Sequence, residues 1–253
     1  MEFVNPREAW LTVILIAGIG FVNYVLLRVY STRGLYYTAI FGGLVNSTAA
    51  VAELASSVTE GAPGAERITI TVSLLTVIAM FLRNLVLVSI FSPPAGFIAL
   101  WPIGAMCLCT VVFAFRDRPG TELVPPSRLS SPVSLRKILS FGVFFLAIQA
   151  LGALGQRLLG EAGSIVVSFL GGFVSSASTT AAAGSLTVHH QISPRTAAIS
   201  TVLASIASAL VNLPIIYRNT HRTGIFRRLI VPSAVTTVIG LAVLAAFLFV
   251  AKK

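Results

Sequence analysis

The chain has 253 residues, of which 56% are hydrophobic and only 10% are charged, and its mean hydropathy is +0.91. An ordinary soluble domain carries about 25% charged residues, so this composition excludes a water-soluble protein. The 18 basic and 8 acidic residues give a net charge of +10. Because most of the basic residues lie at the ends of apolar stretches, they indicate contact with anionic lipid head groups and not binding to nucleic acid.

Eight apolar stretches of about 20 residues predict membrane helices. In chain order they span 10–30, 35–57, 68–91, 96–115, 138–158, 163–187, 195–217 and 229–251. Continuous apolar runs of this length favour helices over the alternating strands of a membrane β-barrel. We therefore expect an all-α, polytopic membrane helix bundle of about eight transmembrane helices.

A basic, Pro- and Ser-rich linker divides the chain into two halves. We expect a first membrane repeat over 1–115, the linker over 116–137 and a second membrane repeat over 138–253. An even number of crossings in each half makes two repeats parallel, and an odd number makes them inverted. Four predicted helices in each half favour the parallel arrangement, although a broken or re-entrant helix would change the count by one.

The two halves also share sequence features. The segment FGGLVNSTAAVAELA begins at Phe41, and LGGFVSSASTTAAAG begins 129 residues later at Leu170. Farther along, Asn84 in RNLVLV matches Asn212 in VNLPII at a separation of 128 residues. Two aligned features at nearly one offset indicate an internal duplication.

The distribution of basic residues gives an expected orientation. With eight crossings, one face of the membrane holds ten of the basic residues and the other holds seven. The larger group includes Arg67, Arg195 and the linker, and the smaller group includes Arg157 and Arg228. Because cytoplasmic loops are enriched in Lys and Arg, we expect both termini and the linker to be cytoplasmic.

The duplicated segments carry the main candidate site, because each places one polar residue, Asn46 or Ser175, near the bilayer midplane. Helical spacing would extend each into a stripe of small and polar side chains that faces the other stripe. Such stripes can form a polar pathway, in which hydroxyl and amide oxygens replace part of a solute's hydration shell, or a seam of close helix packing. The candidate ligand-binding or pathway residues are Gly42, Gly43, Asn46, Ser47, Glu53, Arg83, Asn84, Gly171, Gly172, Ser175, Ser176, Thr179 and Asn212.

Two of these residues are charged and lie inside predicted membrane helices. Glu53 could bind a cation or carry a proton, pair with Arg83, or extend toward the membrane interface. Arg83 could instead attract an anion. Asn84 and Asn212 could line one polar interior, or Asn212 could satisfy the backbone carbonyl that Pro214 leaves without its helical partner.

The sequence contains no recognised catalytic or cofactor motif: HExxH, GxSxG, Cys-rich metal spacing and a glycine-rich phosphate loop are all missing. We therefore expect no enzyme and no cofactor, and we leave a metal site open. The expected partners are membrane lipids and a small cation as substrate, with a homo-oligomer allowed for, and no nucleic acid.

The start of the chain resembles the uncharacterised membrane domain that is often fused behind an MgtC/SapB-type domain in bacteria and archaea: VNPREAWLTVILIAGIGFVNYVLLRVYSTRGLYYTAIFGGLVNSTAAVAELA. The later half of that domain is similar to the segments FLGGFVSSASTTAAAG and PRTAA. The resemblance implies a multi-pass protein of the prokaryotic plasma (inner) membrane, connected with magnesium only by association.

These observations favour an integral membrane transporter or channel-like protein, with a cation as the expected solute and a polar site where the repeats meet near the midplane. In the alternative, the chain is a non-transporting membrane scaffold or regulatory subunit. The polar stripes are then packing seams, and the basic linker contacts a partner or lipid.

Overall fold

The computed structural model describes residues 35–57, 65–116, 135–220 and 223–250, and this part of the chain forms seven helices. The helices are α2 (Leu35–Ser57), α3 (Ala65–Phe91), α4 (Pro93–Arg116), α5 (Leu135–Leu159), α6 (Glu161–Val188), α7 (Pro194–Thr220) and α8 (Thr223–Val250). The all-α prediction is confirmed for these residues. The largest difference from the predicted bounds is the start of α8, predicted at 229 and found at Thr223. The helix predicted over 10–30 and most of the linker lie outside the described residues.

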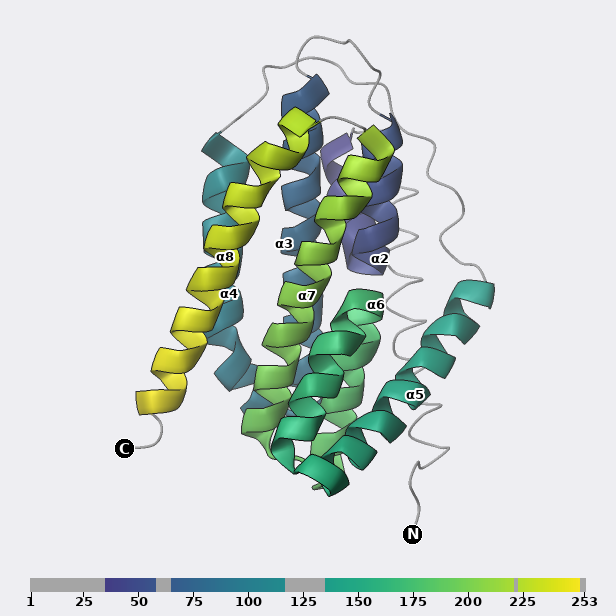
Figure 1. Cartoon of the computed structure of the whole chain (residues 1–253), viewed down its shortest axis with the longest axis vertical. Helices are drawn as coiled ribbons and strands as arrows, with labels where there is room; N and C mark the ends of the chain where they lie inside the picture. The colour runs from purple at the N-terminus through teal and green to yellow at the C-terminus, as the bar shows by residue number, and fades with distance from the viewer. Residues whose placement is uncertain (1–34, 58–64, 117–134, 221–222, 251–253) are drawn as a thin grey trace.

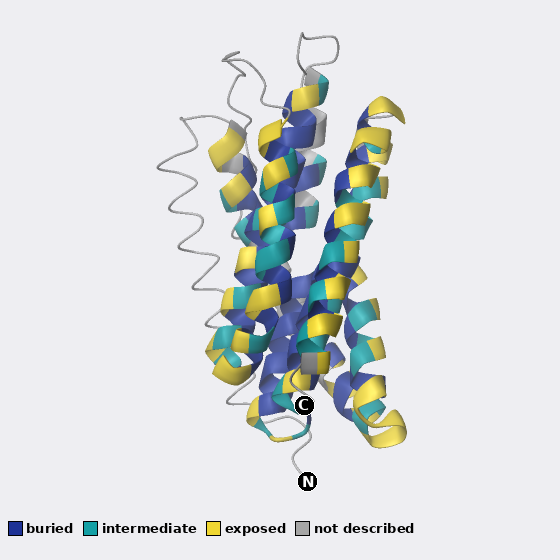
Figure 2. Cartoon of the chain, turned by 90° about the vertical axis from the view of Figure 1, so that its left-hand side faces the viewer, coloured by how far each residue is buried: buried dark blue, intermediate teal, exposed yellow. Residues whose placement is uncertain are grey.

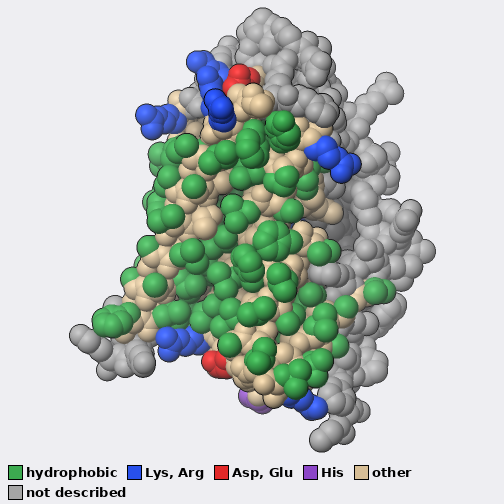
Figure 3. Space-filling view, in the orientation of Figure 1, with side chains coloured by type: hydrophobic (Ala, Val, Ile, Leu, Met, Phe, Trp, Pro, Cys, Tyr) green, Lys and Arg blue, Asp and Glu red, His purple; other side chains and the backbone are tan. Residues whose placement is uncertain are grey.

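Long apolar helices identify the chain as a membrane protein. Among the described residues, five helices are long and apolar enough to cross a bilayer, namely α3, α4, α6, α7 and α8. Figure 3 shows a wide band of hydrophobic side chains, with the charged ones gathered at the two ends of the bundle. This distribution matches a hydrocarbon layer about 30 Å thick between two polar interfaces.

Two of the helices, however, are broken at one residue. Asn46 in α2 has φ −154° and ψ 100°, and Ser175 in α6 has φ −158° and ψ 101°. These are extended values, which end one helix and begin another. A Cβ on Gly42 would lie 2.9 Å from the Cβ of Ala50, whereas residues eight apart are separated by about 12 Å in a straight helix. The chain therefore turns back at Asn46, and α2 is a helical hairpin, named hairpin 1 below.

The same reversal occurs in α6, named hairpin 2. A Cβ on Gly171 would lie 2.7 Å from the Oγ1 of Thr179, eight residues later. Glu161, the first residue of α6, accepts hydrogen bonds from the side chains of Ser193 and Thr196, which lie beyond the end of α6. Hairpin 2 therefore enters and leaves at the same end of the bundle.

Hairpin 1 also has both of its ends on one side of the bundle. Its first leg packs through Ala39 against Ile68 at the start of α3, and its second leg packs through Val51 against Ile70 and Leu74. In Figure 1, α2 occupies only the upper half of the bundle and α6 only the lower half. The two hairpins thus enter from opposite ends, so the prediction that these two segments cross the membrane is wrong.

Contacts between helix ends fix the directions of the other helices. Arg228 Nε lies 3.4 Å from Glu66 Oε1, which joins the start of α8 to the start of α3. Arg195 Nη2 donates to the carbonyl of Leu248 at 3.2 Å, which joins the start of α7 to the end of α8. We name these two ends of the bundle the Glu66 end and the Glu161 end.

Corresponding helices of the two halves consequently run in opposite directions, since α3 begins at the Glu66 end and α7 begins at the Glu161 end. The parallel arrangement favoured by the sequence is wrong for these helices, because each half contains one hairpin that does not cross. The expected division of basic residues changes for the same reason. Arg67 lies at the same end as Arg228, and Arg157 lies at the same end as Arg195.

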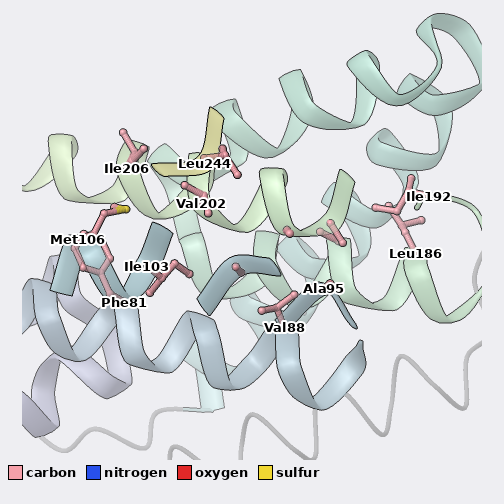
Figure 4. Close-up of a cluster of buried hydrophobic side chains, with 14 of the residues drawn as sticks. Phe81, Val88, Ala95, Ile103, Met106, Leu186, Ile192, Val202, Ile206 and Leu244 are labelled. Atoms are coloured by element: carbon pink, nitrogen blue, oxygen red, sulfur yellow. The ribbon is translucent and has the colours of Figure 1, made fainter. Parts of the chain in front are cut away.

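The hydrophobic core lies between α3, α4, α6, α7 and α8, as the close-up in Figure 4 shows. Phe81 and Met106 are fully buried within it, and Met106 packs so closely on Gly240 that a Cβ there would lie 2.5 Å from the sulfur. Outward surfaces of the helices are exposed, as Figure 2 shows. Hairpin 2 contributes Ala183 and Leu186 to this core.

The contact between the two ends of hairpin 2 predicts a pH effect. The hydrogen bond from the Ser193 side chain, followed by that from Thr196, lowers the pKa of Glu161 below its ordinary value of 4.5. A lowered pKa means that the ionised carboxylate stabilises the fold above the unfolded pKa, and that this stabilisation is lost as the pH falls through the folded pKa.

We therefore expect the melting temperature of Glu161→Gln in detergent to fall less on acidification through the range below 4.5 than that of the wild type. Because Glu161 is exposed, the difference should be small. Thr196→Val removes one donor and keeps the carboxyl group. The fall in its melting temperature on acidification should therefore lie between that of Glu161→Gln and that of the wild type. Identical melting curves of the wild type and Glu161→Gln across this pH range would count against the contact.

Candidate functional site

The tips of the two hairpins meet at one side chain, Arg83 of α3. Its Nη1 donates to the backbone carbonyl of Leu44 at 3.5 Å, and its Nη2 donates to the Oγ of Ser176 at 3.3 Å. Leu44 lies two residues before the break at Asn46, and Ser176 directly follows the break at Ser175. One guanidinium, only 8% exposed, therefore contacts two hairpins that enter from opposite ends.

The length of the hairpin legs places this contact deep in the bundle. At a rise of about 1.5 Å per residue, the legs of hairpin 1 are roughly 16 Å long and those of hairpin 2 roughly 20 Å long. Half of the hydrocarbon layer is about 15 Å, so both tips lie near the midplane. Polar groups at this depth are costly unless they find partners, which explains why Arg83 is surrounded by hydrogen-bond acceptors.

Asn84 extends the polar contact from α3 to α7. Its Oδ1 accepts from Arg83 Nε at 3.4 Å and from Nη2 at 3.3 Å, and its Nδ2 donates to the Oγ of Ser205 at 2.9 Å. Ser205 in turn donates to the carbonyl of Thr201 at 2.7 Å. Asn84 and Ser205 are both fully buried. The asparagine thus fixes the guanidinium in place and ties α3 to α7.

The tip of hairpin 2 is built around Ser175. Its Oγ accepts from the backbone N–H of Ser178 at 3.3 Å, so Ser175 caps the second leg of the hairpin. Thr179 Oγ1 donates to the carbonyl of Ser175 at 2.8 Å. The second leg therefore begins at the midplane, and its positive dipole end lies beside Ser176 and the guanidinium of Arg83.

This cap yields a prediction. Replacing Ser175 by Ala removes the acceptor, and we expect a loss of about 1 kcal/mol in stability. Replacing it by Asn should be tolerated, because Asn46 has nearly the same backbone conformation at the break of hairpin 1 and because Asn caps helices as well as Ser does. Melting temperatures in one detergent test both variants. A Ser175→Asn protein that is less stable than Ser175→Ala would contradict the assignment.

The tip of hairpin 1 is more open. The side chain of Asn46 is exposed, whereas that of the following Ser47 is 3% exposed. Glu53 lies on the second leg, and its side chain is outside the described residues. The pairing of Glu53 with Arg83 and its role as a cation ligand or proton carrier therefore stay predictions.

The glycine pairs of the two segments have two different roles. A Cβ on Gly43 would lie 2.6 Å from the carbonyl oxygen of Thr76, and one on Gly172 would lie 2.6 Å from that of Ala204. These glycines let hairpin 1 approach α3 and hairpin 2 approach α7. Gly42 and Gly171 instead lie inside the hairpins, where the two legs meet. The predicted stripes along continuous helix faces are therefore wrong, because each break folds the stripe back on itself.

Asn212 of α7 is 2% exposed, and within the described part of the chain neither its Nδ2 nor its Oδ1 has a hydrogen-bond partner. It therefore does not satisfy the carbonyl that Pro214 leaves open, which was one of the two hypotheses. The first half has Asn84 at the aligned position, and there both the oxygen and the nitrogen of the amide have hydrogen-bond partners. Buried polar groups are usually paired. Burying the unpaired amide of Asn212 therefore costs free energy of folding that the bonded amide of Asn84 does not cost.

Sequence reasoning missed two members of this site. Leu44 contributes through its backbone carbonyl, which its side chain does not reveal. Ser205 lies opposite Asn84 in space, but the aligned residue in the first half is Val77, so the duplication gives no signal for it. In the described residues, no group of three or more His, Cys, Asp or Glu side chains could hold a metal ion.

Comparison with known proteins gives one match. A family model described as a domain of unknown function, DUF4010, matches residues 14–220. No curated protein and no solved structure matches the chain. The matched range includes both hairpins and Arg83.

Proposed function

Since the chain belongs to the DUF4010 family, whose description names no activity, we propose a function from the geometry. The protein is an integral membrane transporter or channel-like protein, in which a small solute passes between the tips of two re-entrant hairpins. The observation that carries this proposal is the contact of one buried guanidinium with both tips.

Two physical arguments support the proposal. Broken helices that bring half-helix ends to the midplane are typical of transporter binding sites. Non-helical backbone at this depth is tolerated only where protein buries it or where it lines a water-filled cavity. Asn46 is the break of hairpin 1, and its side chain is exposed, which favours a water-filled path on that side.

A cation remains a second candidate solute, because Glu53 lies on the second leg of hairpin 1, seven residues from the break. Magnesium enters only through the resemblance to domains fused to MgtC-like proteins, and the family match contains no information on such a fusion. The alternative function is a non-transporting scaffold or regulatory subunit, in which the exposed tip of hairpin 1 contacts a partner protein. The close packing at Gly43 and Gly172 fits both functions.

Flux measurements test the proposal. Purified protein in liposomes should carry at least one solute from a panel of inorganic cations, inorganic anions and small neutral molecules. We expect Asn46→Ala to change this flux severalfold, and Glu53→Gln to change it only if the solute is a cation. Gly104→Ala is the matched control, because a Cβ at Gly104 meets nothing within 4 Å. A folded protein that carries nothing across the whole panel would favour the scaffold.

A further inference from the structure

We infer that the Glu66 end of the bundle binds the head groups of anionic phospholipids at the cytoplasmic surface of the membrane. This inference does not depend on the proposed function. It starts from an unequal distribution of arginines between the two ends, which can be counted only once the directions of the helices are known.

Further contacts show which helix ends belong to the Glu66 end. Ala114, near the end of α4, packs in one cluster with Ile70, near the start of α3, and with Ile225, near the start of α8. The rings of Tyr217 and Phe226, with centroids 5.5 Å apart, join the end of α7 to the start of α8. The ends of α4 and α7 and the starts of α3 and α8 therefore lie together.

The two ends differ in the number of described arginines. Five exposed arginines lie at the Glu66 end, namely Arg67, Arg116, Arg218, Arg227 and Arg228. The described arginines at the Glu161 end are Arg157 and Arg195. Each end has one described acidic side chain, after which it is named. Because basic residues are enriched on the cytoplasmic side, where the leaflet is negatively charged, the count places the Glu66 end in the cytoplasm.

The first turns of α8 indicate that the partner is a lipid. Ile230 and Val231 follow Arg227 by three and four residues, so they share its face of the helix. They are 39% and 56% exposed. This face therefore presents a guanidinium and, next to it, apolar side chains that lie toward the hydrocarbon. A phospholipid has the two matching parts, an anionic phosphate that arginine binds through paired N–H groups and acyl chains, whereas free phosphate has only the first.

The last turn of α7 extends this surface. Arg218 belongs to it, because the neighbouring Tyr217 contacts Phe226, which precedes Arg227. Tyr217 is 43% exposed, and exposed tyrosines at the end of a membrane helix commonly lie among lipid head groups. Figure 3 shows basic side chains gathered around an acidic one at the upper end of the bundle. Two arginines from two helices and one aromatic side chain thus form one lipid-binding surface.

The orientation assigns a side of the membrane to each hairpin. Hairpin 1 enters from the cytoplasmic side, and hairpin 2 enters from the outer side. Arg116, the last residue of α4 before the linker, lies in the cytoplasm, and the end of α8 at Leu248 lies on the outer side. The sequence analysis instead expects the linker and both termini on one side.

The binding of lipid is measured as the melting temperature of the full chain in one detergent. Phosphatidylglycerol is added in increasing amounts, and phosphatidylcholine and inorganic phosphate are the comparison probes. A ligand that binds the folded protein raises its melting temperature. We expect a rise with phosphatidylglycerol and none with the other two. An equal rise with phosphatidylcholine would overturn the recognition of charge, and an equal rise with inorganic phosphate would overturn the assignment to a lipid.

A double variant locates the surface. Arg218→Gln with Arg227→Gln removes two charges from the Glu66 end, and Arg157→Gln with Arg195→Gln is the matched control at the Glu161 end. One arginine near a charged membrane surface changes the affinity about fivefold, so we expect the midpoint of the phosphatidylglycerol titration to rise at least about fivefold in the first variant and less than about twofold in the control. Each shift is measured from the variant's own melting temperature without lipid, which separates binding from stability. Equal midpoints would overturn the location.

The orientation is tested separately by labelling. Thr223→Cys and Val188→Cys are made in a chain whose Cys107 and Cys109 are replaced by Ala, and both positions are exposed. A membrane-impermeant maleimide is applied to intact bacterial cells that express the chain and to inside-out vesicles. We expect Val188→Cys to react in cells and Thr223→Cys to react in the vesicles alone. Reaction of Thr223→Cys in intact cells would overturn the cytoplasmic placement of the Glu66 end.

Discussion

Asn84→Leu is expected to destabilise the protein, and Asn212→Leu is expected to stabilise it, although the two asparagines occupy aligned positions in the two halves. Asn84 is fully buried and bonded to both Arg83 and Ser205. Its replacement by Leu leaves a buried guanidinium and a buried hydroxyl with one partner fewer each. We expect a loss of about 2 kcal/mol, within the range for unsatisfied buried groups.

Asn212 is expected to lower the stability of the fold, because in the described part of the chain its amide is buried without a hydrogen-bond partner. Leucine has a similar volume and removes the cost of burying the amide, which is about 1–3 kcal/mol in proteins. The melting temperature of Asn212→Leu should therefore equal or exceed that of the wild type.

Both variants are compared with the wild type in one detergent, at one protein concentration. Asn84→Leu is expected to melt below the wild type and Asn212→Leu at or above it. If both variants shift the melting temperature in the same direction by the same amount, then the two asparagines do not differ in their contribution to stability. That result would contradict the difference in hydrogen bonding described for Asn84 and Asn212.

Gly172→Ala is expected to produce the second large effect. The new Cβ would lie 2.6 Å from both the Cα and the carbonyl oxygen of Ala204 on α7, a contact with backbone that no side-chain rotation relieves. Hairpin 2 would have to move away from α7, and we expect a loss of about 1–3 kcal/mol, the range for overpacked cores.

Gly104→Ala is the matched control for Gly172→Ala. It lies in α4, where a Cβ meets nothing within 4 Å, and Ala is a better helix former than Gly by about 1 kcal/mol. We therefore expect Gly104→Ala to melt at or above the wild-type temperature. Equal melting temperatures of Gly172→Ala and Gly104→Ala would show that hairpin 2 does not pack on α7 as closely as described.

Much of the fold follows from the sequence, because the thickness of the bilayer sets the length of the apolar run that a membrane helix needs. The predicted range of α2, 35–57, agrees with Leu35–Ser57, and α4 and α6 agree to within three residues. The sequence leaves a broken or re-entrant helix open but does not place a break, because Asn46 and Ser175 lie inside continuous apolar runs that have no proline. When each of these runs is counted as one full crossing, the number of crossings in each half comes out even. An even number predicts parallel repeats, which is the wrong arrangement.

The candidate site was predicted only in part. The duplication singled out Asn46, Ser175, Asn84 and Asn212, and the structure gives each of the first three a defined place at or beside the tips. The partners could not be predicted, since they come from distant parts of the chain: Arg83 contacts Ser176, 93 residues away. Which residues lie together depends on the direction of each hairpin, and hydropathy contains no information on that.

The most direct test of the account is the side of the membrane from which the two ends of hairpin 2 can be labelled. Single cysteines at Glu161, Val188 and Arg228 are introduced after Cys107 and Cys109 have been replaced by Ala, and sealed vesicles are treated with a membrane-impermeant maleimide. All three positions are exposed. The account predicts that Glu161→Cys and Val188→Cys react from the same side and Arg228→Cys from the other. Labelling of Glu161→Cys and Val188→Cys from opposite sides would show that α6 crosses the bilayer and would contradict it.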